Sequence, residues 1–451
     1  MNGRFTVASE CPSCGAPLDF REGSNALRCG HCRSHLLVTG RKQVLSYAIP
    51  PSLTVQGAVA RAAAAHKQNG LAHRIVHSQL YFLPYYRLTG HDFLWEWVPP
   101  SAQRVEVVRG DDEESRFRAW ESERSLLRGG GVLQFRDRYI EKNFLACDLY
   151  GAGVYSLGVR PSVLRLRLFQ RAALEADGKP VSATLSPEAA LTQGLKTDDH
   201  TVLYRQTLGC VLSVIYFPFW VVEAECRGER HLTIIDAVAQ TLVTLDASPA
   251  LYAVLNRPPS ADPQSLGFRP LICPNCGWDL PVRPDDSIFL CSSCDRAWQV
   301  AGQEFFGVAS QVVEKPPAGI QGPLQYLPLW VLQTGSGPGA RRFFAPAFRY
   351  RRLQLLSDLA MNMARQQPMY SVTNGVIPGL RGCYYDREDA VKLAQFAAAG
   401  LHAKDPEKLS AMQADRLTVS GTTLTWFPFL DRGYSLVEPS TKTSLARQLL
   451  L

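Results

Sequence analysis

Two identical cysteine frames constrain this chain more than any other feature. Each frame has the spacing C-x2-C-x14-C-x2-C. The first consists of Cys11, Cys14, Cys29 and Cys32. The second starts 262 residues later (273 − 11) and consists of Cys273, Cys276, Cys291 and Cys294. Two facing Cys-x-x-Cys turns deliver four thiolates at the corners of a tetrahedron, which is the geometry of structural zinc sites. We therefore expect two bound Zn²⁺ ions, in closed sites that leave no coordination position for catalysis.

The residues between the cysteine pairs predict a small hairpin in each frame. Proline and glycine around the first pair favour a tight turn whose amides point at the sulfur atoms. The apolar stretches that follow would supply the strands: 18–20 with 26–27 in the first frame, and 280–282 with 288–290 in the second. This pattern resembles the zinc-ribbon family over residues 8–38 and 268–300. The resemblance implies metal binding and says little about function.

Two histidines flank Cys32 and compete as ligands on paper. His31 and His35 are replaced in the second frame by Ser293 and Ala297, so we expect both histidines to be exposed. Structural disulfides would need an oxidising compartment, and no secretory signal precedes Cys11. A redox site of the thioredoxin type would need one Cys-x-x-Cys pair opening a helix.

Composition places the chain among globular proteins of several domains. Its 451 residues are 46% hydrophobic and 20% charged, which is enough for three or four domains. The formal charge of +7 permits contact with nucleic acid or with an anionic membrane surface but demands neither. The longest apolar run, Cys210–Val222, is too short to span a bilayer and predicts a buried strand. We expect a cytoplasmic protein with no membrane span.

A second motif recurs four times: an aromatic residue, a large apolar residue, proline, a large apolar residue, and an aromatic residue or leucine. The copies are Phe82-Leu83-Pro84-Tyr85-Tyr86, Tyr216-Phe217-Pro218-Phe219-Trp220, Tyr326-Leu327-Pro328-Leu329-Trp330 and Trp426-Phe427-Pro428-Phe429-Leu430. Because proline cannot donate to a sheet ladder, we expect each Pro-aromatic motif to mark an edge strand, a bulge or a kink where a strand ends. Their aromatic rings are expected in the core rather than on a ligand-binding platform.

Helix signals also occupy corresponding places. Ser186 followed by Pro187 predicts a helix N-terminus, and Asp386 predicts another, over residues 386–400. Both helices should lead into a strand that carries a Pro-aromatic motif. An Ala-rich helix over Ser52–Lys67, closed by Gly70, has no counterpart and explains why the first half is longer between its cysteines and its first motif.

The order of these elements predicts a tandem duplication, with halves near 1–262 and 263–451. The prolines of the motifs are 134 residues apart in the first half (218 − 84) and 100 in the second (428 − 328), and the charged stretch Asp111–Arg128 should supply much of the excess as an exposed insertion. We expect an α+β fold, mostly β, in which each ribbon is attached to an antiparallel β unit with one or two helices. The expected units are ribbon 1 (8–38), a β domain with the Ala-rich helix and the charged insertion (39–170), a helix plus β segment closing the first half (171–262), ribbon 2 (268–300), and a second-half β unit with helix 386–400 (301–451).

Arginines alternate with apolar or aromatic residues in both halves, as in Leu164-Arg165-Leu166-Arg167-Leu168. Alternation puts arginine on one face of a strand, and such a face is suited to phosphates or single-stranded nucleic acid. A solvated outer sheet face is the expectation that we favour. The candidate contacts are Arg165, Arg167, Arg341, Arg342, Arg349, Arg351 and Arg352.

Motifs for catalysis are missing from the sequence, which has no P-loop and no G-x-S-x-G elbow. Ribbons followed by Tyr216–Trp220 or Tyr326–Trp330 resemble bacterial zinc-ribbon proteins associated with SPFH-domain and phage-shock-type membrane-stress loci. We predict a non-enzymatic adaptor or scaffold that assembles proteins, with nucleic-acid binding as the alternative. An enzyme with a site spread over the β domains is the third class. Partner and oligomeric state do not follow from the sequence.

Overall fold

The computed structural model describes residues 6–39, 44–70, 74–98, 132–147, 165–196, 201–226, 228–247, 251–257, 266–301, 304–314, 322–335, 340–375, 380, 382–414 and 416–451. The fold is α+β and mostly β, as predicted. Its helices are α1 (Val55–Gln68), α3 (Arg171–Asp177), α4 (Pro187–Leu195), α5 (Leu251–Leu255), α6 (Leu353–Gln366), α7 (Arg387–Gly400), α8 (Pro406–Ala411) and the 3-10 turn η4 (Arg447–Leu449).

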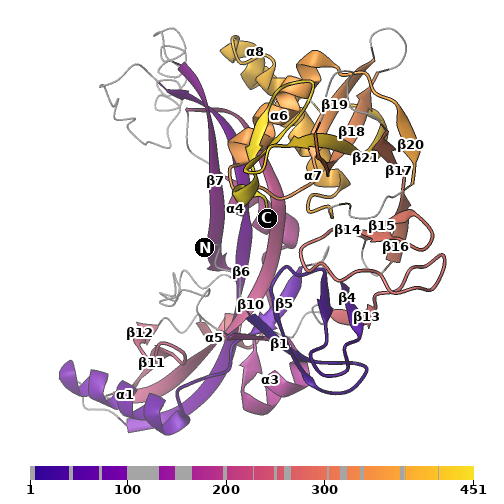
Figure 1. Cartoon of the computed structure of the whole chain (residues 1–451). Helices are drawn as coiled ribbons and strands as arrows, with labels where there is room; N and C mark the ends of the chain where they lie inside the picture. Colours follow the sequence, from indigo (N-terminus) through magenta and orange to yellow (C-terminus); the bar gives the residue numbers. More distant parts are fainter. Residues whose placement is uncertain are drawn as a thin grey trace.

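Strands of the first half form one large sheet, and the short strands of ribbon 1 lie beside it. They are β1 (Thr6–Glu10), β2 (Pro17–Arg21), β3 (Ala26–Arg28), β4 (His35–Thr39), β5 (Leu45–Ala48), β6 (Arg74–Val98), β7 (Val132–Leu145), β8 (Arg165–Leu168), β9 (Lys179–Pro180), β10 (Val202–Cys226), β11 (Glu229–Asp236) and β12 (Leu242–Ala247). The order along the sheet is β12-β11-β10-β5-β8-β1-β2, and β6 pairs with β10, β7 and β9. Figure 1 shows β6 and β10 running from α1 at one end of the molecule to the second half at the other.

Strands of the second half form a sheet of their own and the sheet of ribbon 2. They are β13 (Gly267–Pro270), β14 (Ile288–Cys291), β15 (Arg296–Ala301), β16 (Glu304–Val308), β17 (Ser310–Val313), β18 (Leu324–Thr334), β19 (Arg341–Pro346), β20 (Val372–Asn374), β21 (Val419–Asp431), β22 (Ser435–Val437) and β23 (Ser444–Ala446). The order is β19-β18-β21-β17-β20, with β22 and β23 extending from β21.

Both main sheets are mixed, so the prediction of purely antiparallel units was wrong. β5 is parallel to β10, and β17 is parallel to β21. In each half the chain returns to this position only after a long excursion that includes a helix, and such a crossover is what a parallel pair requires.

The four Pro-aromatic motifs pair with one another in the same register. Tyr216 lies opposite Pro84 and Pro218 opposite Phe82 in the first half. In the second half Tyr326 lies opposite Pro428 and Pro328 opposite Trp426. The first residue of one motif therefore always faces the proline of the other. The parallel neighbour keeps this register too, since Ala48 pairs with Tyr216 and Val312 with Trp426.

These motifs lie inside long central strands, which corrects the expectation of strand ends, edges or kinks. Each motif sits where one outer neighbour of its strand ends. The carbonyl of Pro84 accepts from Ala146 N at 2.9 Å, just beyond the end of β7, and the carbonyl of Pro328 accepts from Ala347 N at 2.9 Å, just beyond β19. A residue in a strand directs its N–H and C=O to the same side. The position without an N–H thus faces the end of a ladder, where its loss costs least.

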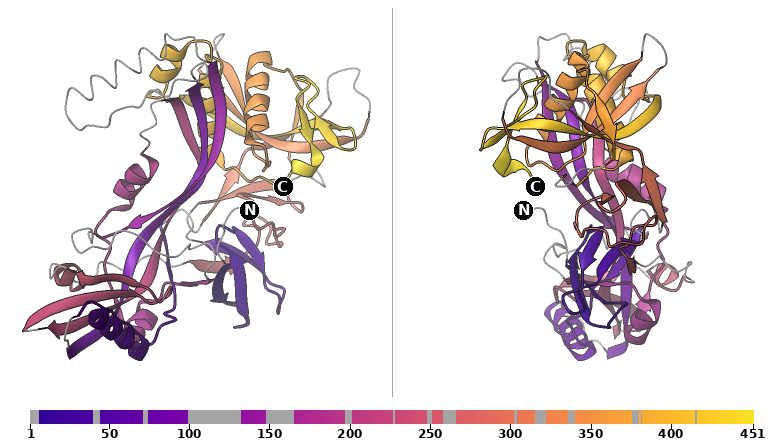
Figure 2. Two further views of the ribbon diagram at one scale, coloured as in Figure 1. Left: turned by 90° about the vertical axis from the view of Figure 1, so that its left-hand side faces the viewer. Right: turned by 45° about the vertical axis from the view of Figure 1, so that its right-hand side comes forward.

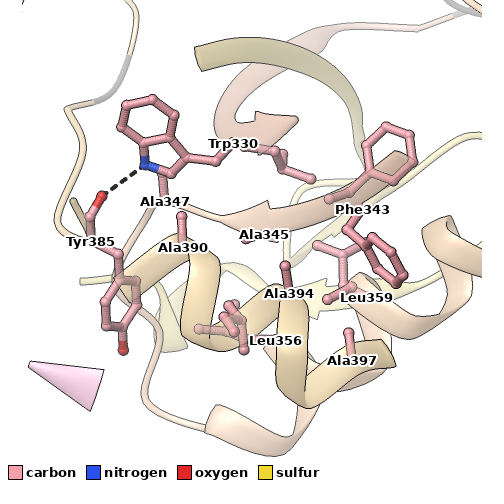
Figure 3. Close-up of a cluster of buried hydrophobic side chains, with 14 of the residues drawn as sticks. Trp330, Phe343, Ala345, Ala347, Leu356, Leu359, Tyr385, Ala390, Ala394 and Ala397 are labelled. Atoms are coloured by element: carbon pink, nitrogen blue, oxygen red, sulfur yellow. Dashed lines mark hydrogen bonds between the residues drawn. The ribbon is translucent and has the colours of Figure 1, made fainter. Parts of the chain in front are cut away.

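The aromatic residue at the fifth motif position closes each unit with a hydrogen bond to backbone. Tyr86 Oη donates to Leu185 O at 2.8 Å, and Trp330 Nε1 donates to Tyr385 O at 3.0 Å (Figure 3). Trp220 Nε1 donates to Leu53 O at 2.9 Å. Most motif rings are buried, so the prediction of a core role is confirmed for them; Trp220 is half-buried. The fully or almost fully buried ones include Phe82, Tyr85, Phe217, Phe219, Trp330 and Trp426.

All three predicted helices are present. Ser186 Oγ accepts from Ala189 N at the start of α4, and Asp386 Oδ1 accepts from Asp389 N at the start of α7. The carbonyl of Ala146 receives the amides just before α4, and that of Ala347 receives the amides just before α7. Helix α1 begins after Thr54 and ends before Gly70, which has φ +71.

One part of the first-half sheet reaches into the second half. We call this part the arm; it comprises residues 88–98 of β6, 132–142 of β7 and 202–212 of β10 (Figure 2). Phe93, Trp95 and Tyr204 of the arm share one hydrophobic core with the second-half sheet and helices. Trp95 stacks on Phe396 of α7, with ring centroids 5.5 Å apart and planes 8° apart. The two halves therefore share a core rather than sitting side by side.

The arm also explains part of the length excess of the first half. Ala146 follows Pro84 by 62 residues (146 − 84), whereas Ala347 follows Pro328 by 19 (347 − 328). Strand β6 continues 14 residues beyond its proline (98 − 84), and β18 continues 6 (334 − 328). The charged stretch Asp111–Arg128 lies outside the described residues.

Candidate metal centres

The eight predicted ligands gather into two groups. Within each group the four sulfur atoms all lie within 4.8 Å of one another. In the first, Cys11 Sγ lies 3.7 Å from Cys32 Sγ, and Cys14 Sγ lies 3.8 Å from Cys29 Sγ. The corresponding distances in the second are 3.6 Å and 3.5 Å. Tetrahedral coordination at a Zn–S distance of about 2.3 Å places sulfur atoms about 3.8 Å apart, so both groups fit zinc.

Local sequence explains why the thiolates converge. The residue after the second cysteine of every knuckle has a left-handed backbone: Gly15 at φ +72, Gly277 at +76, Arg33 at +63 and Asp295 at +53. This conformation closes the turn, and Gly15 N donates to Cys11 O at 2.8 Å. Glycine adopts it without strain, which is why glycine is the first-knuckle residue in both ribbons.

Backbone amides inside each turn point at the sulfur atoms. The amides of Ser13 and Cys14 hydrogen-bond to the Cys11 sulfur, and those of Asn275 and Cys276 do the same for Cys273. Such bonds stabilise thiolate charge at a metal. The chain therefore has two structural zinc sites, and each is closed because four protein ligands fill the tetrahedron.

The ribbon hairpins form differently from the prediction. The two strands between the cysteine pairs of ribbon 1, β2 and β3, lie in different sheets. Strand β2 pairs with β1 across the first knuckle, and β3 pairs with β4 across the second. In ribbon 2, β14 pairs with β15 across its second knuckle. A Cys-x-x-Cys turn is itself the hairpin turn, so each strand pairs across its own turn.

Ribbon 1 and ribbon 2 pack against each other. Strand β13, which leads into ribbon 2, pairs with β4 of ribbon 1 over four residues from Gly267 to Pro270. Asn25 Nδ2 donates to Asp286 O at 2.7 Å, and Asn25 N donates to Pro284 O at 2.6 Å. A small hydrophobic cluster joins residues of both ribbons, among them Ala26, Leu37, Leu271, Leu280 and Phe289.

This contact corrects the expectation for one histidine. His35 is half-buried between the ribbons, and its Nδ1 lies 3.0 Å from the carbonyl oxygen of Leu280. His31 is exposed, as expected. Neither belongs to a metal group. The sequence carried a weak signal for the contact, because the short β-type segment at 267–270 precedes ribbon 2 and has no strand of its own half to pair with.

The candidate arginine contacts are scattered over different environments. Arg342 Nη2 donates to Pro368 O at 2.8 Å and its guanidinium lies 5.2 Å from the ring centroid of Tyr370. Arg349 Nη1 donates to Asp285 Oδ2 at 3.0 Å. Arg341, Arg351, Arg352 and Arg167 are exposed, and nothing is described of the Arg165 side chain. The structure thus brings together no single arginine face among the described residues.

The aromatic residues interleaved with the second-half arginines lie in the core. They are Phe343, Phe344, Phe348 and Tyr350. A stacking platform for bases needs exposed rings, and these four rings do not supply one. Nucleic-acid contact by the exposed arginines stays a prediction.

No protein-family model, curated protein or solved structure matches this chain. Among the described helices, none is both long and apolar enough to cross a bilayer. Outside the two metal groups, the four remaining cysteines are unpaired: Cys147, Cys210, Cys226 and Cys383. A functional assignment therefore rests on the two zinc sites and on the surfaces that they hold in place.

Proposed function

We propose that this chain is a non-enzymatic, zinc-stabilised adaptor that assembles proteins, and that ribbon 2 carries its docking surface. The observation that carries the proposal is an exposed apolar pair beside the second zinc knuckle. Trp278 is 67% exposed and Ile272 is 43% exposed. Tryptophan is enriched at the energetic centres of protein interfaces and is costly to leave in water.

The zinc site holds this pair rigidly. Cys273 N donates to Trp278 O at 2.8 Å, and the Trp278 amide hydrogen-bonds to the Cys276 sulfur. Ile272 lies in a β-bridge with Asp279, the next residue along. A preorganised aromatic anchor loses little conformational entropy on binding, which favours affinity from a small surface.

The corresponding positions of ribbon 1 support this assignment. Glu10 stands where Ile272 stands, and Ala16 where Trp278 stands, 262 residues earlier in each case. Both ribbons share the metal frame, so the frame alone does not require a tryptophan. The apolar pair is a property of ribbon 2, and it fits a partner protein with an apolar, concave docking surface.

We further infer that the two halves arose by tandem duplication. The matching motif registers, the matching carbonyl partners of Ala146 and Ala347, and the two cysteine frames support this inference. Similarity of the ribbon and Pro-aromatic motifs to bacterial zinc-ribbon proteins of membrane-stress loci favours an assembly of that kind as the setting.

The test is affinity capture from a native extract with the zinc-loaded protein and its Trp278→Ala variant. We expect the variant to keep two zinc ions per chain and its unfolding midpoint, and to lose a stoichiometric partner. Tyr434→Ala, at a residue that is 86% exposed and outside the ribbons, is the matched control and should retain the partner. Equal capture by both variants would contradict the assignment of the surface.

A further inference from the structure

A cavity of about 520 Å³ lies where four parts of the chain meet. Residues on its walls come from the base of the arm, from ribbon 1, from ribbon 2 and from the first turns of α7. Arg87 and Val211 represent the first wall, Glu22 the second, Asp285 the third and Glu388 the fourth. Cavities of this volume, placed between domains, are typical of sites for small molecules.

Hydrogen bonds between the walls hold the cavity open. Asn25 Nδ2 joins ribbon 1 to ribbon 2 through Asp286 O, at 2.7 Å. Ser287 N joins ribbon 2 to the second half through Cys383 O, at 2.6 Å. Asp389 Oδ1 joins α7 to the arm by accepting from the lining residue Gly209, at 3.0 Å. The walls thus form a closed ring of contacts, and the zinc sites fix two of them.

The sheet itself is interrupted at the cavity. The β6–β10 register shifts between Leu208 and Val211, and Gly209 lies in this shift with φ +57. A bulge turns a backbone amide out of the ladder, and here the amide of Gly209 points at Asp389 across the cavity wall. Bulges occur at sites that a sheet must shape, because they cost ladder pairing.

Charge in the lining is unbalanced. The carboxylates outnumber the permanently charged cations by three (5 − 2). The carboxylates are Glu22, Asp285, Asp386, Glu388 and Asp389, and the cations are Arg87 and Lys392. Carboxylates already engage both cations: Arg87 bonds to Glu22 and, at 3.0 Å, to Glu141, and Lys392 Nζ lies 3.8 Å from Asp389 Oδ1. An anion entering the cavity would therefore meet a negative field, whereas an ammonium group would reduce it.

We propose that this cavity binds a small organic cation, an aliphatic amine with one or two ammonium groups. The volume accommodates such a molecule, the bulge and the ribbon contacts preform the walls, and the net charge selects its sign. This ligand site is separate from the ribbon 2 surface, so it goes beyond the adaptor role. Because its walls belong to both halves and both ribbons, a bound amine would favour the arrangement in which all four are in contact.

Calorimetric titration of the zinc-loaded chain with 1,4-diaminobutane tests the proposal, with succinate as an anionic probe of similar length. We expect one saturable site for the diamine and no saturable heat for succinate. Glu388→Gln should weaken the diamine about tenfold by removing one lining charge. Glu407→Gln is the matched control, an exposed first-turn glutamate of α8 outside the cavity, and should leave the affinity unchanged.

Two filling variants separate the cavity from the outer surface. Val211→Phe and Leu191→Phe enlarge lining residues on different elements without changing charge. Each should abolish diamine binding while two zinc ions per chain are retained. Diamine binding that survives both substitutions, equal binding of succinate, or no saturable diamine heat in the wild type would each overturn the proposal.

Discussion

The indole nitrogen of Trp330 donates a hydrogen bond to the backbone carbonyl of Tyr385, 3.0 Å away, and so ties the central strand β18 to the segment that starts α7. Figure 3 shows this bond above the alanines of α7, which pack against the strand that carries Ala345 and Ala347. Trp330 is 2% exposed. One side chain therefore fills the core and satisfies a carbonyl at a helix entrance.

Replacing Trp330 by alanine should lower the free energy of unfolding by about 3–5 kcal/mol, through the lost burial and the cavity left behind. Trp220→Ala should cost less, because Trp220 is only half-buried although its Nε1 donates to Leu53 O at 2.9 Å. Urea unfolding followed by circular dichroism measures both. Equal losses would mean that burial does not set the difference.

Removal of one zinc ligand should release one metal ion per chain. Cys14→Ser and Cys276→Ser each leave three thiolates, which hold zinc far more weakly than four. Zinc content by mass spectrometry should fall from two to one. Cys226→Ser is the control, since Cys226 is buried outside both groups and should keep two.

The effect of losing the second zinc should extend beyond ribbon 2. Ribbon 1 takes β13 as the third strand of its sheet, in the order β13-β4-β3. In Cys276→Ser, hydrogen exchange should therefore speed up in β4 as well as in β14 and β15. Exchange confined to ribbon 2 would argue that the ribbons are energetically independent.

Gly400→Ala tests the packing of the arm on α7. In an exposed helix this change stabilises by about 1 kcal/mol. Here a Cβ at position 400 would lie 2.4 Å from Met361 Sδ and 2.8 Å from Trp95 Cζ2. We expect a destabilisation of about 1–3 kcal/mol, as for other overpacked cores. The double variant with Trp95→Phe should recover part of the loss, and a stabilised single variant would contradict the contact.

Asp286 should make stability depend on pH near neutrality. Burial raises the pKa of the Asp286 carboxyl to about 7; Arg283 opposes this shift and Asp285 adds to it. Since the folded-state pKa lies above the unfolded one, the folded protein binds the extra proton, and stability falls as pH rises toward 7 and is lowest above it. Relative to Asp286→Asn, the wild type should lose about 1 kcal/mol between pH 6 and pH 8. A constant difference across this range would exclude a raised pKa.

Local chemistry made the metal sites and the helix starts predictable. Cysteine spacing, Ser186 with Pro187, and Asp386 each act within a few residues, so the sequence displays the cause beside the effect. The Pro-aromatic motifs were predicted as strand ends, because proline was read without its neighbours. Each motif in fact continues in a central strand, and only the outer strand ends there, which is a long-range relationship.

Contacts between distant segments were beyond the sequence pattern. The pairing of β13 with β4 and the stacking of Trp95 on Phe396 join residues that no local period connects. His35 was expected in solvent for the same reason. Trp278 was visible beside Gly277, but its exposure depends on what the rest of the fold leaves uncovered.

The strand that completes the first ribbon has a consequence for synthesis. Residue Gly267 follows its partner Thr39 by 228 positions (267 − 39). A nascent chain therefore makes its amino-terminal cysteines early but leaves β4 without this neighbour until more than half of the polypeptide has been translated. During that interval an open strand edge stands next to a young metal site, and such an edge is what chaperones and premature aggregation both recognise.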